Sequence, residues 1–375
     1  MMRLPPLSNG PAVSFSATAG AAQDIMARAV PAMRNPDGGA PLHAVGRGIK
    51  GVREPADGDW LVADIGGTHL RAGLSAAGAT PREVEVFSGA DYPDLHAALA
   101  AYLAATGASP VAACLAVAAP VAGDEVRFTN SAWHFSRRRL QRRLGVDRLL
   151  VLNDFEALAL ALPTLKRADL TVLGPKSPRA RRASQAPLAV LGPGTGLGVA
   201  TLVPQADRWI ALAGEGGHAG FAPQDDLEFA LAQIMRRGTA RLSNESILSG
   251  PGLSALYRAL AEIDGAQPVS LSPAQVSARA LDSSDARAVR AVDVFCAVLG
   301  AVAGDIALIT GARGGVYVGG GIAPRLAPLL EKSRFRARFD DKAAQRDYVG
   351  AIPTWLISAP VPALSGAVEA LRAHS

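Results

Sequence analysis

Apolar residues occur in short runs separated by glycine-rich or polar breaks from about residue 59 onward. This pattern predicts an α/β protein, because runs of this length between turn residues are typical of buried strands. The first series of expected strands covers residues 60–66, 70–76, 83–88, 111–118 and 148–152. A helix is expected near 93–105, with Leu95, Leu99, Tyr102 and Leu103 on its apolar face.

A second series begins after Pro163, with expected strands over 188–192, 198–203 and 209–213 that are followed mostly by helices. The longest helix is expected over about 284–310, ending at Gly311, because glycine suits the left-handed conformation after a helix. A strand at 315–318 follows. Both series start with paired strands and continue into helices, so the sequence predicts two α/β domains related by duplication.

Each series contains one glycine-rich turn between two apolar runs. The turns are Asp64-Ile65-Gly66-Gly67-Thr68 and Gly192-Pro193-Gly194-Thr195-Gly196-Leu197-Gly198. A strand resumes after each turn, which predicts a hairpin rather than the strand-to-helix step of a dinucleotide or Walker loop. Glycine lets backbone N–H groups approach phosphate oxygens, and a threonine hydroxyl adds a donor. Two such hairpins indicate a nucleotide held between two similar domains.

The other phosphate-binding motifs have weak support. The permissive dinucleotide pattern occurs at 214–219 and 250–255, but Glu215 would face a pyrophosphate in the first and the second lies in a polar loop. The Walker lysine motif is absent from the sequence.

Length and composition narrow the class further. A chain of 375 residues, 49% of them hydrophobic, is expected to form about two domains, and it has no uncharged apolar run of 18 residues for a membrane span. Cys114 and Cys296 are interpreted as small buried residues in a cytoplasmic protein, and two cysteines cannot form a four-cysteine zinc site. Residues 1–57, rich in proline and glycine with Phe15 as their one aromatic residue, predict a disordered extension.

The net charge of +5 raises the alternative of a nucleic-acid partner. Much of the excess lies in two clusters, Arg137, Arg138, Arg139, Arg142 and Arg143 on an expected helix after Ser136, and Arg179, Arg181 and Arg182 in a loop. Neither cluster alternates with aromatic residues, and no helix-turn-helix pattern adjoins them. We interpret both as solvated surface and expect neither a nucleic acid nor a membrane as partner.

Candidate catalytic and binding residues occur in three polar segments. Asn153 and Asp154 come just after a buried strand, where α/β proteins build their sites, although Asp154 could instead only cap the helix expected over 156–162. Glu215 and His218 lie in a glycine-rich loop, for which the alternative is a solvated turn. Glu245 lies in a polar segment that enters a helix, for which the alternative is capping. Carboxylates that accept from hydroxyls, beside amide and imidazole donors, suit a polyhydroxyl ligand.

Seven motifs together resemble the bacterial glucokinase family. They are D-I-G-G-T (64–68), T-N-x-x-W-x-F-S (129–136), L-N-D-F (152–155), G-x-G-T-G-L-G (192–198), G-E-G-G-H (214–218), E-S-I-L-S-G-P-G (245–252) and G-G-V-Y-V-G-G-G-I-x-P-R (314–325). They occur in order from about residue 60 nearly to the C-terminus, and they match the branch without the zinc–cysteine cluster of the repressor–kinase (ROK) group. The resemblance implies the two-domain actin-like ATPase (ribonuclease H-like) fold. An active-site cleft would separate a small α/β domain, 58–164 plus 359–375, from a large one, 165–358.

The resemblance also implies an activity and its residues. The family phosphorylates D-glucose at the 6-hydroxyl with ATP and Mg²⁺, giving glucose 6-phosphate for glycolysis, and a structural zinc is not expected. Asp154 would be the general base, and the sugar would be bound by Asn153, Asp154, Glu215, His218 and Glu245. Phosphates would be held by Ala63, Asp64, Ile65, Gly66, Gly67, Thr68, Gly194, Thr195 and Gly196, with Asp64 near Mg²⁺ and with Gly319, Gly320 and Gly321 beneath the adenosine. A homodimer is left open.

Some features keep other functions in view. His69 and the segment 362–366 depart from the family pattern, which bears on nucleotide affinity rather than on the sugar ligands. A kinase for mannose or an N-acetyl sugar would use the same fold, and a substrate panel would distinguish it. A non-catalytic sugar sensor or repressor would need a DNA-binding domain or loss of the base. Asp154 is present and residues 1–57 lack a helix-turn-helix pattern, which disfavours that class.

Overall fold

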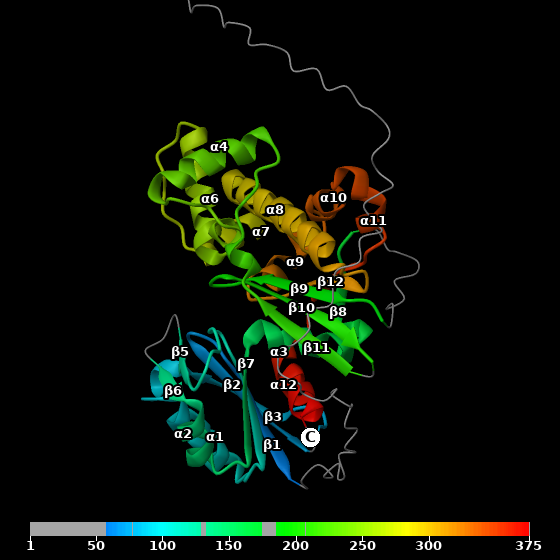
Figure 1. The fold of residues 1–375 in the computed structure, drawn as a ribbon. Helices are drawn as coiled ribbons and strands as arrows, with labels where there is room; N and C mark the ends of the chain where they lie inside the picture. Colours follow the sequence, from blue (N-terminus) through cyan, green and yellow to red (C-terminus); the bar gives the residue numbers. More distant parts are fainter. Residues whose placement is uncertain (1–57, 77, 129–132, 175–184, 207, 375) are drawn as a thin grey trace, which may run out of the picture. The chain divides into compact units, whose positions relative to one another are not determined.

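Two β-sheets organise the chain in a computed structural model, which describes residues 58–76, 78–128, 133–174, 185–206 and 208–374 (Figure 1). Both sheets lie within one unit, Val52–Ser375. The first sheet has the order β3-β2-β1-β4-β7. Its strands are β1 (Asp59–Ile65), β2 (His69–Ala76), β3 (Arg82–Ser88), β4 (Ala112–Val117) and β7 (Arg148–Asn153).

The second sheet has the order β11-β10-β9-β12-β13-β8. Its strands are β8 (Leu170–Val172), β9 (Leu188–Pro193), β10 (Leu197–Gln205), β11 (Arg208–Gly214), β12 (Gly315–Val318) and β13 (Thr354–Ile357). In both sheets three antiparallel strands, β1 to β3 and β9 to β11, are continued by two parallel ones. This shared order agrees with the doubled organisation that the sequence predicts, and it places one glycine turn in the same hairpin of each sheet.

The remaining elements surround these sheets. A two-stranded ribbon pairs β5 (Glu125–Arg127) with β6 (His134–Ser136). The helices that follow strands of the first sheet are α1 (Leu95–Thr106), α2 (Arg137–Leu144) and α3 (Asp154–Ala161). The later helices are α4 (Asp226–Met235), α5 (Asn244–Ile247), α6 (Gly250–Ile263), α7 (Pro273–Leu281), α8 (Ala286–Thr310), α9 (Ala327–Leu330), α10 (Phe335–Asp340), α11 (Arg346–Gly350) and α12 (Pro362–Ala373).

Helices α3 and α12 exchange sheets. Helix α3 follows the first sheet in the chain, but Leu158 and Leu162 pack with residues of the second sheet. Helix α12 follows the second sheet, and Leu364 and Val368 pack on the first sheet. The two helices also lie side by side (Figure 1), with Gly366 of α12 against the backbone of α3. This exchange ties both sheets to the two helices, one of which begins at Asp154.

The core of the second half is built around α8. Its N-cap is Asp285, and its C-cap Gly311 has a φ of 62°, so the expected end of this helix is confirmed. By length and composition α8 is apolar enough to cross a membrane, but 78% of its most apolar window is buried inside the protein. We therefore interpret α8 as a core helix.

Most expected strands and helices are confirmed within one or two residues. Ser136 caps α2 by accepting from the backbone of Arg139, as expected, and the arginines of α2 are partly or fully exposed. The expectations for residues 1–57, for the arginines at 179–182 and for residues 129–132 of one motif lie outside the described residues.

Candidate active site

The first glycine turn joins β1 to β2. Gly66 N–H donates to the backbone oxygen of His69 at 2.9 Å, and Gly67 and Thr68 are exposed. Ala63 and Ile65 are fully buried in the sheet. Within the predicted phosphate segment 63–68, the groups that face solvent are therefore those of the turn itself, while Ala63 and Ile65 hold the strand in place.

The second turn joins β9 to β10 and packs against the third glycine segment. Gly194 N–H donates to Gly196 O at 2.8 Å and closes the turn. A methyl group on Gly192 would lie 2.6 Å from the backbone carbon of Gly319, and Gly320 has a φ of +79°. Glycine is required at these positions by close approach and by a left-handed conformation. The structure thus brings the predicted residues at 194–196 and 319–321 together.

Asn153 and Asp154 occupy the junction between β7 and α3. Asn153 Oδ1 accepts from Phe155 N–H at 2.9 Å and from Glu156 N–H at 3.4 Å, which makes Asn153 the N-cap. Helix α3 begins at Asp154 itself, so the alternative in which Asp154 is the cap of a helix over 156–162 is wrong. The cap uses only the amide oxygen of Asn153, so its amide nitrogen can still donate, and a hydrogen bond from the Asn153 side chain is one of the contacts that lower the pKa of Asp154.

Asp154 is a half-buried carboxyl group with an altered acidity. Burial, followed by the charge of Asp64, raises the pKa of Asp154 to about 6. The hydrogen bond that Asp154 accepts from Phe155 N–H at 3.0 Å opposes this shift. A carboxylate with a pKa near 6 is ionised at neutral pH yet is a stronger base than an exposed aspartate, which is the property that general-base catalysis needs.

Asp64 is the second half-buried carboxyl group of the site. Burial raises its pKa, and the guanidinium of Arg71 works in the opposite direction. Arg71 Nη1 lies 3.1 Å from Asp64 Oδ2. Arg71 is directly opposite Asp64 in the β1–β2 register. The hairpin that the sequence predicts around this turn is therefore enough to predict the pair.

Glu245 lies in the first turn of α5, a helix capped by Ser243. The alternative, a capping arrangement with Glu245 in the first turn of the helix, is therefore confirmed, and the cap is Ser243. Glu245 Oε2 accepts from Leu197 N–H at 2.8 Å, directly after the second glycine turn. A residue larger than glycine does not fit at position 196 in this arrangement, since a methyl group there would lie 2.3 Å from Glu245 Oε2. The bond between Leu197 and Glu245 joins residues 48 positions apart, so no local pattern predicts it.

Glu215 and His218 form a pair on the surface. His218 Nε2 lies 3.9 Å from Glu215 Oε2, and their side chains are 64% and 72% exposed. Residues 216–218 form one turn of 3-10 helix within this glycine-rich loop. Both side chains are open to a ligand from solvent.

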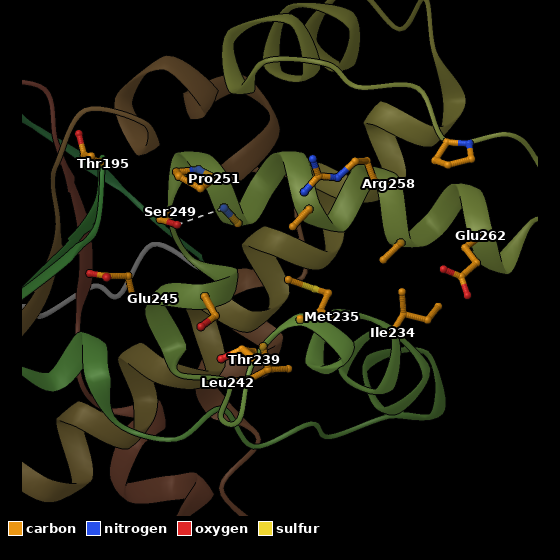
Figure 2. A pocket seen from close by; sticks show the side chains of 16 residues that line it. Thr195, Ile234, Met235, Thr239, Leu242, Glu245, Ser249, Pro251, Arg258 and Glu262 are labelled. Carbon is orange, nitrogen blue, oxygen red and sulfur yellow. Dashed lines mark hydrogen bonds between the residues drawn. The ribbon is translucent and has the colours of Figure 1, made fainter.

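A pocket of about 720 Å³ runs along α6 (Figure 2). Thr195, Glu245 and Ser249 lie at one end of it, and Arg258 and Glu262 lie toward the other. Its apolar lining comes from Ile234, Met235, Leu242, Pro251, Ala255 and Ala259. The pocket starts at the second glycine turn and has the size of a typical small-molecule site. This pocket was not predicted from the sequence, because its walls, α4 and α6, meet only through tertiary packing.

The fit of a divalent cation depends on Asp64 and Asp154. Among the described residues no group of three or more His, Cys, Asp or Glu side chains is placed to hold a metal ion by itself. Mg²⁺ commonly uses one or two protein carboxylates together with substrate phosphates and water. Two half-buried carboxyl groups, one of which raises the pKa of the other, fit such a cation because it would relieve their repulsion.

The fold and the site together define a two-domain sugar kinase. The crystal structure of glucokinase from an Antarctic psychrotroph superimposes with a TM-score of 0.75 at 37% sequence identity, covering 84% of this chain and 99% of that one. The predicted fold class, the actin-like two-domain α/β fold, is therefore confirmed.

Sequence comparisons give the family. The family model described as Glucokinase matches residues 61–374. The glucokinase of Chromobacterium violaceum is 48% identical over 315 residues, which are 84% of this chain and 89% of that protein. The Bifunctional protein glk of Burkholderia pseudomallei is 44% identical over 321 residues, and the match spans 85% of this chain but 49% of that protein. The chain belongs to the glucokinase family and is a glucose kinase.

Proposed function

We propose that this glucose kinase transfers the γ-phosphoryl group of ATP to the 6-hydroxyl of D-glucose, with Asp154 as the general base. The observation that carries the proposal is the state of Asp154. It follows a strand end, it is not the helix cap, and its pKa of about 6 suits proton abstraction near neutral pH. Asn153 beside it has amide protons to donate to the same sugar.

The sugar would be held by groups from three segments. Asn153 and Asp154 come from the start of α3, Glu215 and His218 from the surface loop, and Glu245 from α5. Carboxylates accept hydrogen bonds from sugar hydroxyls, and the imidazole and amide donate. When the 6-hydroxyl lies against Asp154, its proton passes to the carboxylate as the oxygen attacks the γ-phosphorus and the bond to the β-phosphate oxygen breaks.

The nucleotide would extend from the glycine turns. Gly66 N–H and Gly194 N–H close the two turns, so the backbone N–H groups of 67–68 and 195–196 would be the ones that donate to phosphate oxygens. Such fixed donors stabilise the charge of the transferring group. We place the nucleoside between the glycines at 319–321 and the adjoining pocket along α6. Asp64, with Asp154 near it, would hold Mg²⁺ bound to the phosphates, and this cation would neutralise charge on them.

The proposal includes the setting of the enzyme. We place the reaction in the cytoplasm, where its product would enter glycolysis. We further propose that residues 58–164 and 359–375 form a small domain and residues 165–358 a large one, with residues 1–57 dispensable. Proteins lacking residues 1–56 should keep the melting temperature and the turnover of the full chain, because the composition of that segment cannot bury much apolar surface. A loss of most activity would contradict this part.

A substrate panel tests the function. Purified protein is assayed with glucose, mannose and N-acetylglucosamine, and with ATP and other nucleoside triphosphates, by following ADP. A second assay coupled to glucose-6-phosphate dehydrogenase reports the position of phosphorylation. We expect glucose and ATP to give the highest kcat/KM and the product to be the 6-phosphate. A higher kcat/KM for another hexose would contradict the proposed substrate preference.

A further inference from the structure

Helix α5 is bonded to the loop that carries the exposed sugar candidates. Asn244 N–H donates to Ala219 O at 2.8 Å, and Ser243 pairs with Gly220 in an isolated bridge. These bonds attach the start of α5 to Ala219 and Gly220, the two residues that directly follow His218. The position of this loop and the position of α5 are therefore linked through the backbone.

The same segment is bonded to the second glycine turn. Gly250 N–H, at the start of α6, donates to Gly194 O at 2.9 Å. Glu245 reaches the other side of the turn, where its Oε2 accepts from Leu197 N–H at 2.8 Å. Two bonds thus hold the turn from both ends, and one of them is made by a side chain that is also assigned to the sugar.

The shape of the turn depends on Glu245. Gly196 leaves the space that Oε2 occupies, since a methyl group there would lie 2.3 Å from this oxygen. Glu245 also lines the pocket that begins at Thr195. Among the described residues no hydrogen bond is made to its second carboxylate oxygen, Oε1, which remains for a ligand.

We infer that Glu245 is a bridge between the two substrates, with Oε2 positioning the phosphate turn and Oε1 receiving a sugar hydroxyl. This inference rests on the proposed function, in which Glu245 binds glucose. Sugar bound to Oε1 restricts the carboxylate, and the restricted carboxylate holds Leu197 N–H and the turn in one arrangement. The triphosphate then binds a turn that is already ordered, so each substrate raises the affinity for the other by the same factor.

Binding measurements without turnover test the bridge. The dissociation constant of a non-hydrolysable ATP analogue is measured with and without glucose, and that of glucose with and without the analogue, by calorimetry. For the wild-type protein we expect a coupling ratio of about fivefold or more, equal in both directions. Glu245→Ala should weaken the analogue several-fold even without glucose, and its coupling ratio should fall to about one.

Two further variants separate the roles of the two oxygens. Glu245→Gln keeps an oxygen that can accept from Leu197 N–H, so analogue binding without glucose should stay near wild type while glucose binds roughly tenfold more weakly. Gly196→Ala has no backbone strain, because Gly196 does not have a positive φ, but its methyl group would displace the Glu245 carboxylate. It should weaken glucose several-fold in the absence of any nucleotide, although Gly196 belongs to the phosphate turn.

His218→Ala is the matched control, because His218 is assigned to the sugar and does not touch the turn. It should weaken glucose and leave analogue binding without glucose unchanged. If Glu245→Ala weakens glucose alone and keeps the coupling ratio, the bridge is wrong and the proposed sugar role stands. If it weakens the analogue alone, both are wrong. Thermal melts establish that each variant is folded, and Glu245→Gln and Gly196→Ala decide the question if the alanine variant at 245 does not fold.

Discussion

Asp64 raises the pKa of Asp154 through its negative charge, although 90 positions separate the two residues in the chain. Asp64 is the next-to-last residue of β1 and is paired with Arg71 on the neighbouring strand. Asp154 begins α3, which follows the last strand of the same sheet. The sheet therefore brings two carboxyl groups together at one edge, and the proton affinity of the proposed base depends on the group proposed to lie near the cation.

The first prediction concerns the acid side of the pH profile. Asp154 must be ionised to accept a proton, so kcat/KM for glucose should fall as the pH drops through about 6, by roughly tenfold per pH unit below it. In Asp64→Asn the charge that raises the pKa of Asp154 is gone, and the acid limb should move to lower pH.

The comparison between the two proteins is made with the same nucleotide and metal concentrations, so titration of ATP itself contributes equally to both profiles. Asp64→Asn is expected to be slower at every pH, because Asp64 is proposed to lie near Mg²⁺, but the readout is the midpoint of the limb. An unmoved midpoint would show that Asp64 does not act on the titrating group.

The second prediction concerns His218. Its imidazole is 64% exposed and lies beside Glu215, so His218→Ala should raise KM for glucose roughly two- to tenfold, as expected for one lost hydrogen bond. KM for ATP and the melting temperature should change little. His96→Ala, on α1 and outside the proposed site, is the matched control and should leave both constants unchanged. An equal rise in both KM values would indicate a structural role for His218.

The third prediction concerns the contact between α3 and α12. A methyl group on Gly366 would lie 1.7 Å from the backbone oxygen of Ala157, which cannot move without moving α3. Gly366→Ala should cost about 1–3 kcal/mol by overpacking and lower the melting temperature by several degrees. It should also lower kcat, because α3 begins at Asp154. Gly350→Ala, where a methyl group meets nothing within 4 Å, is the matched control for helix propensity. Equal melting temperatures for both variants would contradict the tight contact.

Local patterns were sufficient for most of the framework. The two hairpins, the capped start of α2 and the end of α8 at Gly311 follow from apolar runs, capping residues and a left-handed glycine, all of which act over a few residues. The exchange of α3 and α12 between the sheets was not predictable in this way. An apolar helix face shows that a helix is packed, but not on which sheet.

The candidate site also has parts that local patterns predict and parts that depend on tertiary contacts. The segments that carry Asn153, Asp154, Glu215, His218 and Glu245 were found from residue types and motifs. The cap of α3 is Asn153, one residue before the Asp154 that the sequence offered as an alternative cap. Asparagine and aspartate are both good caps, and only the backbone decides between them. The raised pKa of Asp154 and the bond from Leu197 to Glu245 join residues that are distant in the chain, so they became visible only in the folded structure.

The final prediction separates the chemistry of Asp154 from its place in the fold. Asp154→Asn keeps the size of the side chain and leaves the cap at Asn153 intact, so α3 should form normally. If Asp154 is the base, kcat should fall by at least about 10²-fold while glucose affinity changes little. Glucose binding is measured by fluorescence and kcat by the coupled assay. A near-normal kcat would show that Asp154 is not the base.

The substitution Asp154→Asn, which should lower kcat, should also raise the stability of the folded protein at neutral pH. The pKa of Asp154 in the folded protein, about 6, is above the ordinary value of 3.8 that applies when the chain is unfolded. Between these values the folded state binds more protons, so stability falls as the pH rises through this window, and the buried charge costs about 1–3 kcal/mol above pH 6. Asparagine cannot ionise. Asp154→Asn should therefore melt at a higher temperature than wild type at pH 7.5, and this difference should vanish near pH 4. A variant that loses turnover while gaining stability only at the higher pH would identify the buried carboxylate as a group kept for catalysis at the expense of stability.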